Sequence, residues 1–307
     1  MYDIIVIGAG PAGMTAAIYA KRASMNVLIL EEINYGGQIA NALHIENYPG
    51  ERNISGIDLV TKIYEQLQEL GVSVIFEKAL DIRKYDSVKY QNIKTVVTAN
   101  NSYEAKAVII ASGSVNRKLG LEEEERLTGR GISYCATCDG NFYKGKTVAV
   151  AGGGNTALEE AVYLSDLAEK VYLIHRRDSF RGEQLSVDEL KEKNNVEFVL
   201  NTCITRLIAK ERLNAIEVTH VVDGRKRIIE LNGLFIAVGR MPENQNFAAV
   251  VRLDDYGYII AGEDCHTSCD GIFAAGDNRT KKLRQLVTAT ADGAMAASEA
   301  IQYIRSL

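Results

Sequence analysis

The sequence contains 307 residues, of which 47% are hydrophobic and 24% are charged, and its formal net charge at pH 7 is −5. A chain of this length can bury one large hydrophobic core or two ordinary ones, and its composition argues against disorder. The mildly acidic balance also argues against a nucleic-acid-binding protein, which usually carries a basic face.

The N-terminal segment, MYDIIVIGAG, has no basic region ahead of its apolar run, and that run spans only residues 4–7. A signal peptide needs a basic region and a longer apolar run. No stretch of the sequence approaches the roughly 18 consecutive apolar residues that a membrane-spanning helix requires. We therefore expect a cytoplasmic protein with no membrane partner.

The first predicted elements are a strand over residues 4–7, a glycine-rich turn, a helix over 14–23 and a strand over 27–30. The turn reads Gly8-Ala9-Gly10-Pro11-Ala12-Gly13, and the second strand ends at Glu31 and Glu32. This order is typical of a dinucleotide-binding fold, in which the three glycines permit a tight turn, the approach of a pyrophosphate and close helix packing. The helix N-terminus favours phosphate, and a carboxylate after the second strand can accept hydrogen bonds from ribose hydroxyls. An ordinary glycine-rich turn remains the alternative for one copy alone.

A buried strand over residues 107–111 ends in Ser112 and Gly113 and closes this first fold. Beyond it lies Cys135-Ala136-Thr137-Cys138-Asp139. The CxxC spacing lets two thiols close a small disulfide ring and often lowers the pKa of one of them. Half of a zinc site is the alternative, but such a site needs a second pair of ligands.

The remaining cysteines are Cys203, Cys265 and Cys269. Five cysteines in a chain without a signal peptide indicate reduced thiols rather than a disulfide scaffold. The segment from Cys265 to Cys269 includes His266, but its spacing is not that of a zinc knuckle and it falls in the other predicted domain. We expect these three residues to be ordinary buried or surface residues, and we predict no metal site.

The strand–turn–helix–strand order then returns. A strand over residues 147–150 precedes a glycine turn, a helix over 158–167 and a strand over 171–174; the turn reads Gly152-Gly153-Gly154-Asn155-Thr156-Ala157. Gly152 follows Gly8 by 144 positions, and Val171 follows Val27 by the same 144. Equal offsets of the turn and of the second strand favour a duplicated dinucleotide-binding fold over two unrelated loops.

The two copies differ in charge where the second strand ends. The first copy ends in Glu31 and Glu32, whereas the second continues into His175, Arg176 and Arg177, with Arg181 further on. A carboxylate suits a free ribose 2′-hydroxyl, and arginine accommodates a 2′-phosphate because its guanidinium pairs with phosphate in a forked geometry. The second site therefore suits NADP; a solvated surface run is the alternative for the arginines.

A strand over residues 234–238 ends in Gly239 and closes the second copy. The roughly sixty residues after Asn244 are too few for a third such fold. They contain a strand over 272–275, then Gly276-Asp277, and a helix over about 283–304. We predict an α/β protein with two Rossmann-like domains, the second inserted into the first: residues 1–113 with 244–307 bind FAD, and residues 114–243 bind NADPH and carry the CxxC pair.

The motifs VIGAGPAG, GGQI, ENYPG, CATCDG, GGGNTALEEA, HRRDSFR and FAAGD occur in this order. In that order, along essentially the whole chain, the sequence resembles the low-molecular-weight thioredoxin reductases. The resemblance implies a homodimer that passes electrons from NADPH through FAD to the cysteine pair and on to thioredoxin or a thioredoxin-like protein. It implies that Cys138 reacts with the flavin, that Cys135 exchanges with thioredoxin and that Asp139 acts as acid–base.

The resemblance also assigns cofactor-binding residues. For FAD they are Gly8, Gly10, Pro11, Ala12, Gly13, Glu31, Glu32, Gly36, Gly37, Gln38, Asn47, Ala111, Gly113, Gly276, Asp277, Arg284, Gln285 and Leu286. For NADPH they are Gly152, Gly154, Asn155, Thr156, Ala157, His175, Arg176, Arg177 and Arg181. Ser112, Leu283 and Glu243 depart from the usual family pattern, and none of these departures removes a reactive group.

Alternative functions stay open. A ferredoxin-fed reductase would be expected to lose the second glycine motif and the arginines, which are present here, and a ferredoxin–NADP reductase of similar fold would lack the CxxC pair. A peroxiredoxin-reducing relative would carry extra domains ahead of Gly8; a glutaredoxin-like or peroxiredoxin partner remains the alternative to thioredoxin. A redox-sensing or metal-storing binding protein on the same fold is the non-enzyme hypothesis. We also expect the inserted domain to rotate, because the cysteine pair and the NADP site must reach one flavin in turn.

Overall fold

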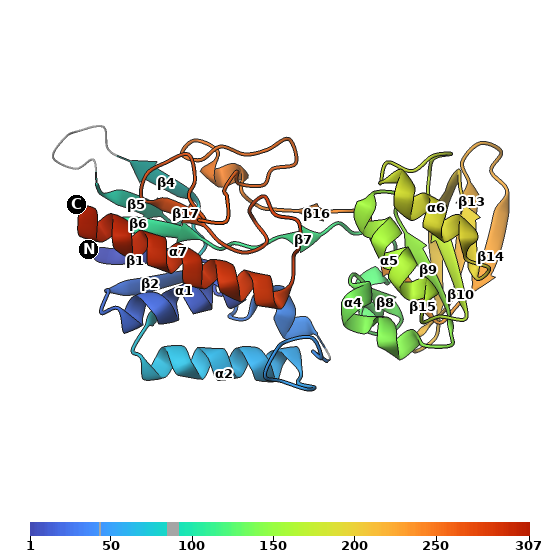
Figure 1. Ribbon diagram of the computed structural model, residues 1–307, viewed down its shortest axis with the longest axis horizontal. Helices are drawn as coiled ribbons and strands as arrows, with labels where there is room; N and C mark the ends of the chain where they lie inside the picture. Colours follow the sequence, from blue (N-terminus) through green and yellow to red (C-terminus); the bar gives the residue numbers. More distant parts are fainter. Residues whose placement is uncertain (43, 85–91) are drawn as a thin grey trace. The chain divides into compact units, whose positions relative to one another are not determined.

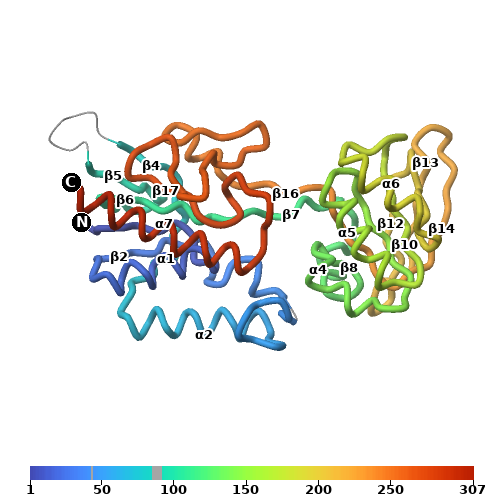
Figure 2. Tube along the Cα trace, viewed as in Figure 1, coloured from blue at the N-terminus to red at the C-terminus, as the bar shows by residue number. Residues whose placement is uncertain are grey.

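The computed structural model describes residues 1–42, 44–84 and 92–307. These residues form two compact units, one made of Met1–Val115 with Met241–Leu307 and the other of Asn116–Arg240. Two short strands, β7 (Val115–Asn116) and β16 (Arg240–Met241), pair with each other where the chain passes between the units (Figures 1 and 2).

The first unit is built on a sheet of strand order β3-β2-β1-β6-β5-β4, and β17 pairs with the last residues of β6. The strands are β1 (Tyr2–Ile7), β2 (Val27–Glu31), β3 (Ser73–Phe76), β4 (Asp81–Lys84), β5 (Lys94–Val97), β6 (Ser102–Ile110) and β17 (Ile272–Ala274). β1, β2, β3, β6 and β17 run parallel, whereas β4 and β5 form an antiparallel extension.

Apolar residues bury both faces of this sheet. Its helices are α1 (Pro11–Arg22), α2 (Gly56–Glu69) and α7 (Leu286–Ser306), with short 3-10 turns η1 (Gly37–Asn41) and η3 (Gln245–Phe247). Ile4 and Val6 pack with α1 and α7, which lie side by side (Figures 1 and 2). Ile5 and Ile7 point to the other face and pack with Phe247 of η3. The uninterrupted apolar run of β1 therefore reflects burial on two faces.

The second unit has a parallel sheet of order β11-β10-β9-β15-β8 and a separate antiparallel sheet of order β12-β13-β14. Its strands are β8 (Ile132–Ser133), β9 (Thr147–Ala151), β10 (Lys170–Ile174), β11 (Val196–Val199), β12 (Thr202–Ala209), β13 (Leu213–His220), β14 (Lys226–Glu230) and β15 (Gly233–Ile236). Its helical segments are α3 (Glu124–Leu127), α4 (Ala136–Asp139), η2 (Gly140–Tyr143), α5 (Asn155–Ser165) and α6 (Gln184–Glu192).

Two layers cover the parallel sheet of this unit. Val148 and Val150 pack with residues of α5 and α6, such as Leu158 and Leu190. On the other face, Ala149 packs in a cluster with residues of β13 and β14. A helical layer therefore lies on one face and the antiparallel sheet on the other.

The predicted fold class is confirmed, since β2-β1-β6 and β10-β9-β15 have the same order and direction. α1 and α5 begin three residues earlier than predicted, because Gly10 and Gly154 are their N-caps and proline is tolerated in the first helical turn. α7 begins at Leu286 rather than near Leu283, because the Gln285 and Thr288 side chains form a capping box there.

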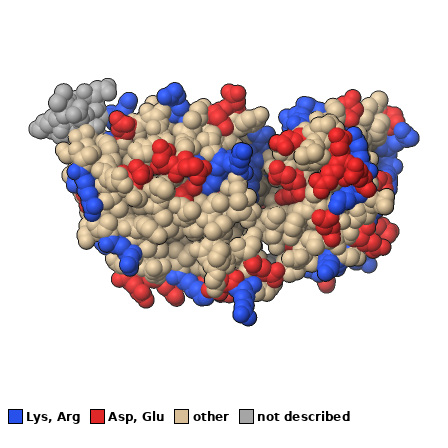
Figure 3. Space-filling view, in the orientation of Figure 1, with Lys and Arg blue, Asp and Glu red and all other residues tan. Residues whose placement is uncertain are grey.

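The charged side chains on the surface are mixed in sign, in keeping with the small net charge (Figure 3). Acidic and basic side chains are interspersed on the face shown in Figure 3. Within residues 1–42, 44–84 and 92–307, no helix is both long and apolar enough to cross a membrane.

Candidate redox and nucleotide sites

The first glycine turn joins β1 to α1 with very little space around its backbone. A Cβ atom on Gly8, whose φ is +104°, would lie 2.4 Å from the Ala111 carbonyl oxygen. A Cβ on Gly13 would lie 1.9 Å from the Gly8 carbonyl oxygen. Gly10 has open space by comparison, with Gly37 Cα 4.0 Å from its Cβ position. The turn is therefore fixed by Gly8 and Gly13, and Gly10 is the position that a ligand could approach.

The acidic end of β2 folds back onto this turn. Glu31 Oε2 accepts a hydrogen bond of 2.7 Å from the Ala9 N–H, and its Oε1 accepts one from the Glu32 N–H. Lys78 pairs with Glu32 at 2.9 Å, and this hydrogen bond raises the Lys78 pKa, against an opposing effect of burial. A cavity of about 370 Å³ is lined by these residues and by Gly8.

Two distant segments meet the first turn. The Gly36 N–H donates to the Ala9 carbonyl at 2.8 Å, and the Cβ position of Gly37 lies 3.2 Å from Gly10 Cα. From the other side, the Cβ position of Gly276 lies 2.9 Å from the Ala12 Cβ. The structure thus brings the predicted Gly36–Gly37 and Gly276 segments together at the N-terminus of α1.

The start of α7 carries several predicted residues. The Asn47 amide donates to the Gln285 side-chain oxygen at 3.2 Å. Arg284 lies over the Tyr258 ring at 4.2 Å, and Leu286 packs in a small apolar cluster. Asn47, Arg284, Gln285 and Leu286 are therefore gathered at this end of α7, whereas Gln38 belongs to η1.

A buried ion cluster holds the Gly276–Asp277 turn. The Asp292 carboxylate accepts the Gly276 N–H at 2.8 Å, two hydrogen bonds from Arg279 at 2.7 and 2.8 Å, and one from Lys281 at 2.9 Å. Burial raises the Asp292 pKa, but these donors outweigh it, so the pKa lies below its ordinary value. The charge at Asp292 is therefore compensated, and its position fixes the turn.

The closing strand of the first unit also ends in a polar network. The Ala111 N–H donates to the Ile7 carbonyl at 2.7 Å, and Gly113 has a φ of +69°. The Ser112 hydroxyl bonds to the Asn244 side chain at 3.2 Å, and Asn244 is fully buried. Ser112 departs from the family pattern, and Asn244 follows Glu243, which also departs from it. The hydrogen bond between Ser112 and Asn244 connects two distant parts of the unit.

The redox loop lies in the second unit, between β8 and η2. Cys135 and Cys138 form a disulfide at the start of α4, and both residues are partly buried. The Ser133 hydroxyl donates to the Asp139 carboxylate at 2.7 Å and accepts the Cys135 N–H at 3.1 Å. Ser133 therefore ties the predicted acid–base group to the backbone of the first cysteine.

A second carboxyl group contacts the same loop from α5. Glu160 Oε1 accepts a hydrogen bond of 3.3 Å from the Ala136 N–H. Burial raises the Glu160 pKa to about 7. The backbone of the redox loop is thus contacted by a carboxyl group from α5 as well as by the Ser133 hydroxyl.

The second glycine turn, between β9 and α5, has an imidazole packed against it. His175 is only 6% exposed, and its ring atoms would lie 2.2 to 2.6 Å from a Cβ atom on Gly153. The Arg181 N–H donates to the Gly153 carbonyl at 2.7 Å. Burial, followed by the charges of Arg181, Arg177 and Arg176, lowers the His175 pKa. His175 is therefore a neutral packing residue of the turn.

The arginines after β10 have a different environment from His175. Arg176, Arg177 and Arg181 are exposed, as are Asn155 and Thr156 at the start of α5. Asn155 accepts the Glu183 N–H at 2.8 Å, which holds the arginine-bearing segment against the glycine turn. Ala157 is buried, and nothing lies within 4 Å of the Cβ position of Gly154.

The remaining cysteines have separate surroundings. Cys265 is fully buried, and burial raises its pKa to about 12; Cys203 and Cys269 are partly buried. His266 pairs with Glu299 at 3.0 Å. In the part of the chain that the structure describes, no group of three or more His, Cys, Asp or Glu side chains is placed to hold a metal ion.

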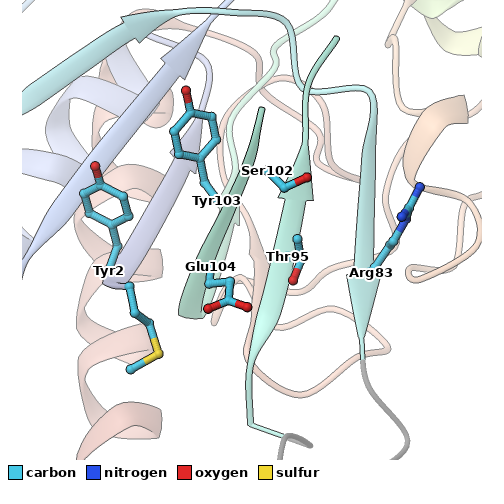
Figure 4. A pocket seen from close by; sticks show the side chains of 7 residues that line it. Tyr2, Arg83, Thr95, Ser102, Tyr103 and Glu104 are labelled. Atoms are coloured by element: carbon cyan, nitrogen blue, oxygen red, sulfur yellow. The ribbon is translucent and has the colours of Figure 1, made fainter. Parts of the chain in front are cut away.

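A further cavity of about 400 Å³ lies at the opposite end of the first sheet (Figure 4). Tyr2 from β1, Arg83 from β4, Thr95 from β5 and Tyr103 from β6 line it (Figure 4). Tyr2 and Tyr103 stand at the beginnings of their strands. Nucleotides bind beyond the carboxyl ends of parallel strands, so this cavity lies at the wrong end of the sheet for one.

The sequence reasoning missed four residues: Ser133, Gly153, Glu160 and Asp292. Gly153 had a signal, since three successive glycines exceed what the dinucleotide motif needs. Glu160 lies within the GGGNTALEEA motif, but its contact with Ala136 depends on the fold. Ser133 and Asp292 had no signal, because each acts on a partner that the fold brings near.

The sequence and the fold are similar to those of known proteins. Residues 2–293 match the family described as pyridine nucleotide-disulphide oxidoreductase. The sequence is 41% identical over 308 residues to the thioredoxin reductase of Listeria innocua, covering 100% of this chain and 95% of the relative. It is 39% identical to that of Bacillus subtilis, covering 100% and 96%. The solved thioredoxin reductase of Streptococcus pyogenes has a TM-score of 0.92 at 40% identity, covering 100% of this chain and 99% of the other.

Proposed function

The chain belongs to the pyridine nucleotide-disulphide oxidoreductase family, and we propose that it acts as a thioredoxin-disulfide reductase. The observation that carries this conclusion is the Cys135–Cys138 disulfide, set between β8 and the second glycine turn. Relatives that match along this whole chain are thioredoxin reductases. The disulfide is accordingly the group that exchanges with the disulfide of thioredoxin.

Family membership implies the use of a flavin and a pyridine nucleotide. We infer that the flavin is FAD and lies in the first unit, because the cavity there is lined by Gly8 of the turn that leads into α1 and by the Glu31 carboxylate. When bound, the pyridine nucleotide would supply a hydride and the flavin would relay two electrons, which the Cys135–Cys138 disulfide accepts.

The nucleotide is inferred to be NADPH, held in the second unit. Exposed Arg176, Arg177 and Arg181 stand beside the glycine turn, where guanidinium groups can pair with a 2′-phosphate. His175 does not share that role in this account, because its ring packs under Gly153. Its contribution is to hold the turn.

The redox loop supplies the proton chemistry. When the disulfide opens, a thiolate must be protonated, and Asp139 is the proposed donor. The Ser133 hydroxyl holds its Oδ2 at 2.7 Å, and the same hydroxyl holds the Cys135 N–H. Asp139→Asn should therefore slow reoxidation of the reduced flavin by the disulfide while leaving flavin reduction by NADPH unchanged; a normal rate would assign the proton to another group.

The second unit contains both the disulfide and the arginines of the proposed nucleotide site. The disulfide and the bound nucleotide must each reach the flavin proposed for the first unit, and thioredoxin must reach the disulfide. We infer that the second unit moves about β7 and β16, which are the two chain connections. A designed disulfide that locks the two units together should stop turnover, and its reduction should restore turnover; normal turnover in the locked protein would contradict this.

The direct test is NADPH-dependent reduction of thioredoxin by the flavin-loaded protein. Cys135→Ser should abolish it, because the thiol assigned to exchange with thioredoxin is lost, and Cys203→Ser is the matched control that should retain it. Turnover in the Cys135→Ser variant would refute the proposed function. A homodimer and a cytoplasmic location stay predictions, the first of which light scattering can test.

A further inference from the structure

Glu160 is a partly buried acid that the mechanism above does not use. Its Oε1 accepts the Ala136 N–H at 3.3 Å, and Ala136 is a fully buried residue between the two redox cysteines. Its Oε2 is buried and has no hydrogen-bond partner among the described residues. Buried carboxyl oxygens in native proteins are almost always hydrogen-bonded, so an unmatched one inside a redox loop requires a reason.

Several groups set the charge of Glu160. Burial favours its neutral form most strongly; the Ala136 N–H and the Arg240 guanidinium favour the carboxylate, and Glu159 on the same helix opposes it. The resulting pKa is about 7. This group can therefore change its charge near neutral pH in response to a new charge nearby.

The elements packed against α5 carry other charges. α4 carries the disulfide and Asp139, whose carboxylate accepts the Ser133 hydroxyl. On α6, Asp188 and Lys191 pair with each other at 2.9 Å. On β10, Lys170 pairs with Glu197 at 3.2 Å. The Asp188 and Lys170 charges are thus compensated locally, and Glu189 and Glu192 on α6 are exposed to solvent. The redox loop is therefore the variable partner of Glu160.

We propose that Glu160 is a positioning residue of the redox disulfide, which acts through the Ala136 amide and takes up one proton when the disulfide is reduced. This inference rests on the proposed function, whose flavin supplies the two electrons. They break the sulfur–sulfur bond and leave two thiolates. Asp139 protonates one sulfur and is reprotonated by solvent, and the charge kept on the other sulfur draws a second solvent proton to Glu160. Reoxidation by thioredoxin releases that proton.

The test is the reduction equilibrium of the Cys135–Cys138 pair as a function of pH. The flavin-loaded protein is equilibrated with glutathione redox buffers between pH 6 and pH 9, and free thiols are alkylated and counted by mass spectrometry. Glu160→Gln keeps an oxygen for the Ala136 N–H but cannot titrate. Glu192→Gln, at an exposed position on α6, is the matched control.

Above pH 7, the oxidised protein has lost the Glu160 proton, so reduction must take one up. As pH rises, the equilibrium constant for reduction should therefore fall more steeply in the unmodified protein than in Glu160→Gln, by up to a further tenfold per pH unit. This difference corresponds to about 30 mV of reduction potential per pH unit. Below pH 7 the two curves should run parallel. Glu159→Gln should move the onset of the extra dependence to lower pH, because Glu159 raises the Glu160 pKa.

The infrared difference spectrum between the oxidised and the reduced protein gives a second readout. At pH 8, reduction should produce a protonated-carboxyl signal, and that signal should be missing from Glu160→Gln. Parallel curves over the whole pH range, or no carboxyl signal in the unmodified protein, would overturn the role of Glu160 alone. A disulfide that neither glutathione nor NADPH reduces would overturn the proposed function and this inference with it.

Discussion

The two glycine turns share a backbone plan but differ in which position must be glycine. In both, the first glycine faces a carbonyl of the closing strand: the Cβ positions of Gly8 and Gly152 lie 2.4 Å from the Ala111 and Ala237 oxygens. The third glycine of the first turn, Gly13, is also indispensable, yet its counterpart 144 positions on is Ala157.

The second position shows the reverse. Ala9 carries a side chain, and its N–H is held by the Glu31 carboxylate. Its counterpart Gly153 can carry none, because the His175 ring fills that space. The residue after the second strand therefore braces the turn in both units, and its shape decides where glycine is required. The two turns share one sequence pattern, but different residues pack against them, and glycine is therefore required at different positions.

The largest difference between the units should appear when the redox loop is disabled. Cys138→Ser should still be bleached by NADPH, because in the proposed sequence of steps hydride reaches the flavin before any thiol is needed. Its reduction of thioredoxin should fall to background. Anaerobic absorbance spectra and a coupled thioredoxin assay measure the two steps separately, and retained thioredoxin turnover would contradict the assigned role of Cys138.

The first unit is braced by a buried ion cluster, so it should respond to the loss of Asp292. Asp292→Ala leaves Arg279 and Lys281 without their partner and should cost about 3–5 kcal/mol of unfolding free energy. Because the Asp292 pKa is depressed, this stabilisation should be present above pH 4 and lost as pH falls through the folded pKa. Denaturant unfolding measures it, with the exposed-pair variant Asp188→Ala as control; equal effects of the two would refute the role of the cluster.

Charge reversal between the sites predicts cofactor choice. Changing Arg176 and Arg177 together to alanine should raise the KM for NADPH about 100-fold, since each charge-assisted hydrogen bond contributes roughly 1.5–3 kcal/mol. The KM for NADH should hardly change, and Arg225→Ala, an exposed arginine elsewhere in the unit, should alter neither. Equal efficiency of the unmodified protein with both nucleotides would remove the assignment.

The smallest effect tests the packing difference between the turns. Gly153→Ala should destabilise the second unit by about 1–3 kcal/mol, because the His175 ring must move. Gly154→Ala, with nothing near its Cβ position, should be almost neutral. Adding His175→Ala should rescue part of the Gly153→Ala loss in a double-mutant cycle. Additive effects would mean that the ring is not the obstacle.

Sequence alone predicts much of this fold, because the glycine turns, apolar strands and CxxC spacing are local patterns. The equal offset of Gly8 and Gly152 predicts the duplication, and the register of β1–β2 and β9–β10 follows it. What sequence cannot show is which side chain meets which. Glu160 reaches Ala136 across 24 positions, and Asp292 reaches Gly276 across 16. The placement of His175 under Gly153 likewise depends on a ring orientation that no spacing rule contains.

The central claim, that electrons pass from NADPH through a flavin to Cys135–Cys138 and on to thioredoxin, is tested most directly by an anaerobic titration. The flavin-loaded protein should need about two equivalents of NADPH per chain for complete bleaching, because the flavin and the disulfide each accept two electrons. Oxidised thioredoxin should then restore the flavin colour, and Cys138→Ser should need about one equivalent and show no recovery. Complete bleaching of the unmodified protein by one equivalent, with the disulfide intact and no recovery on adding thioredoxin, would contradict the account.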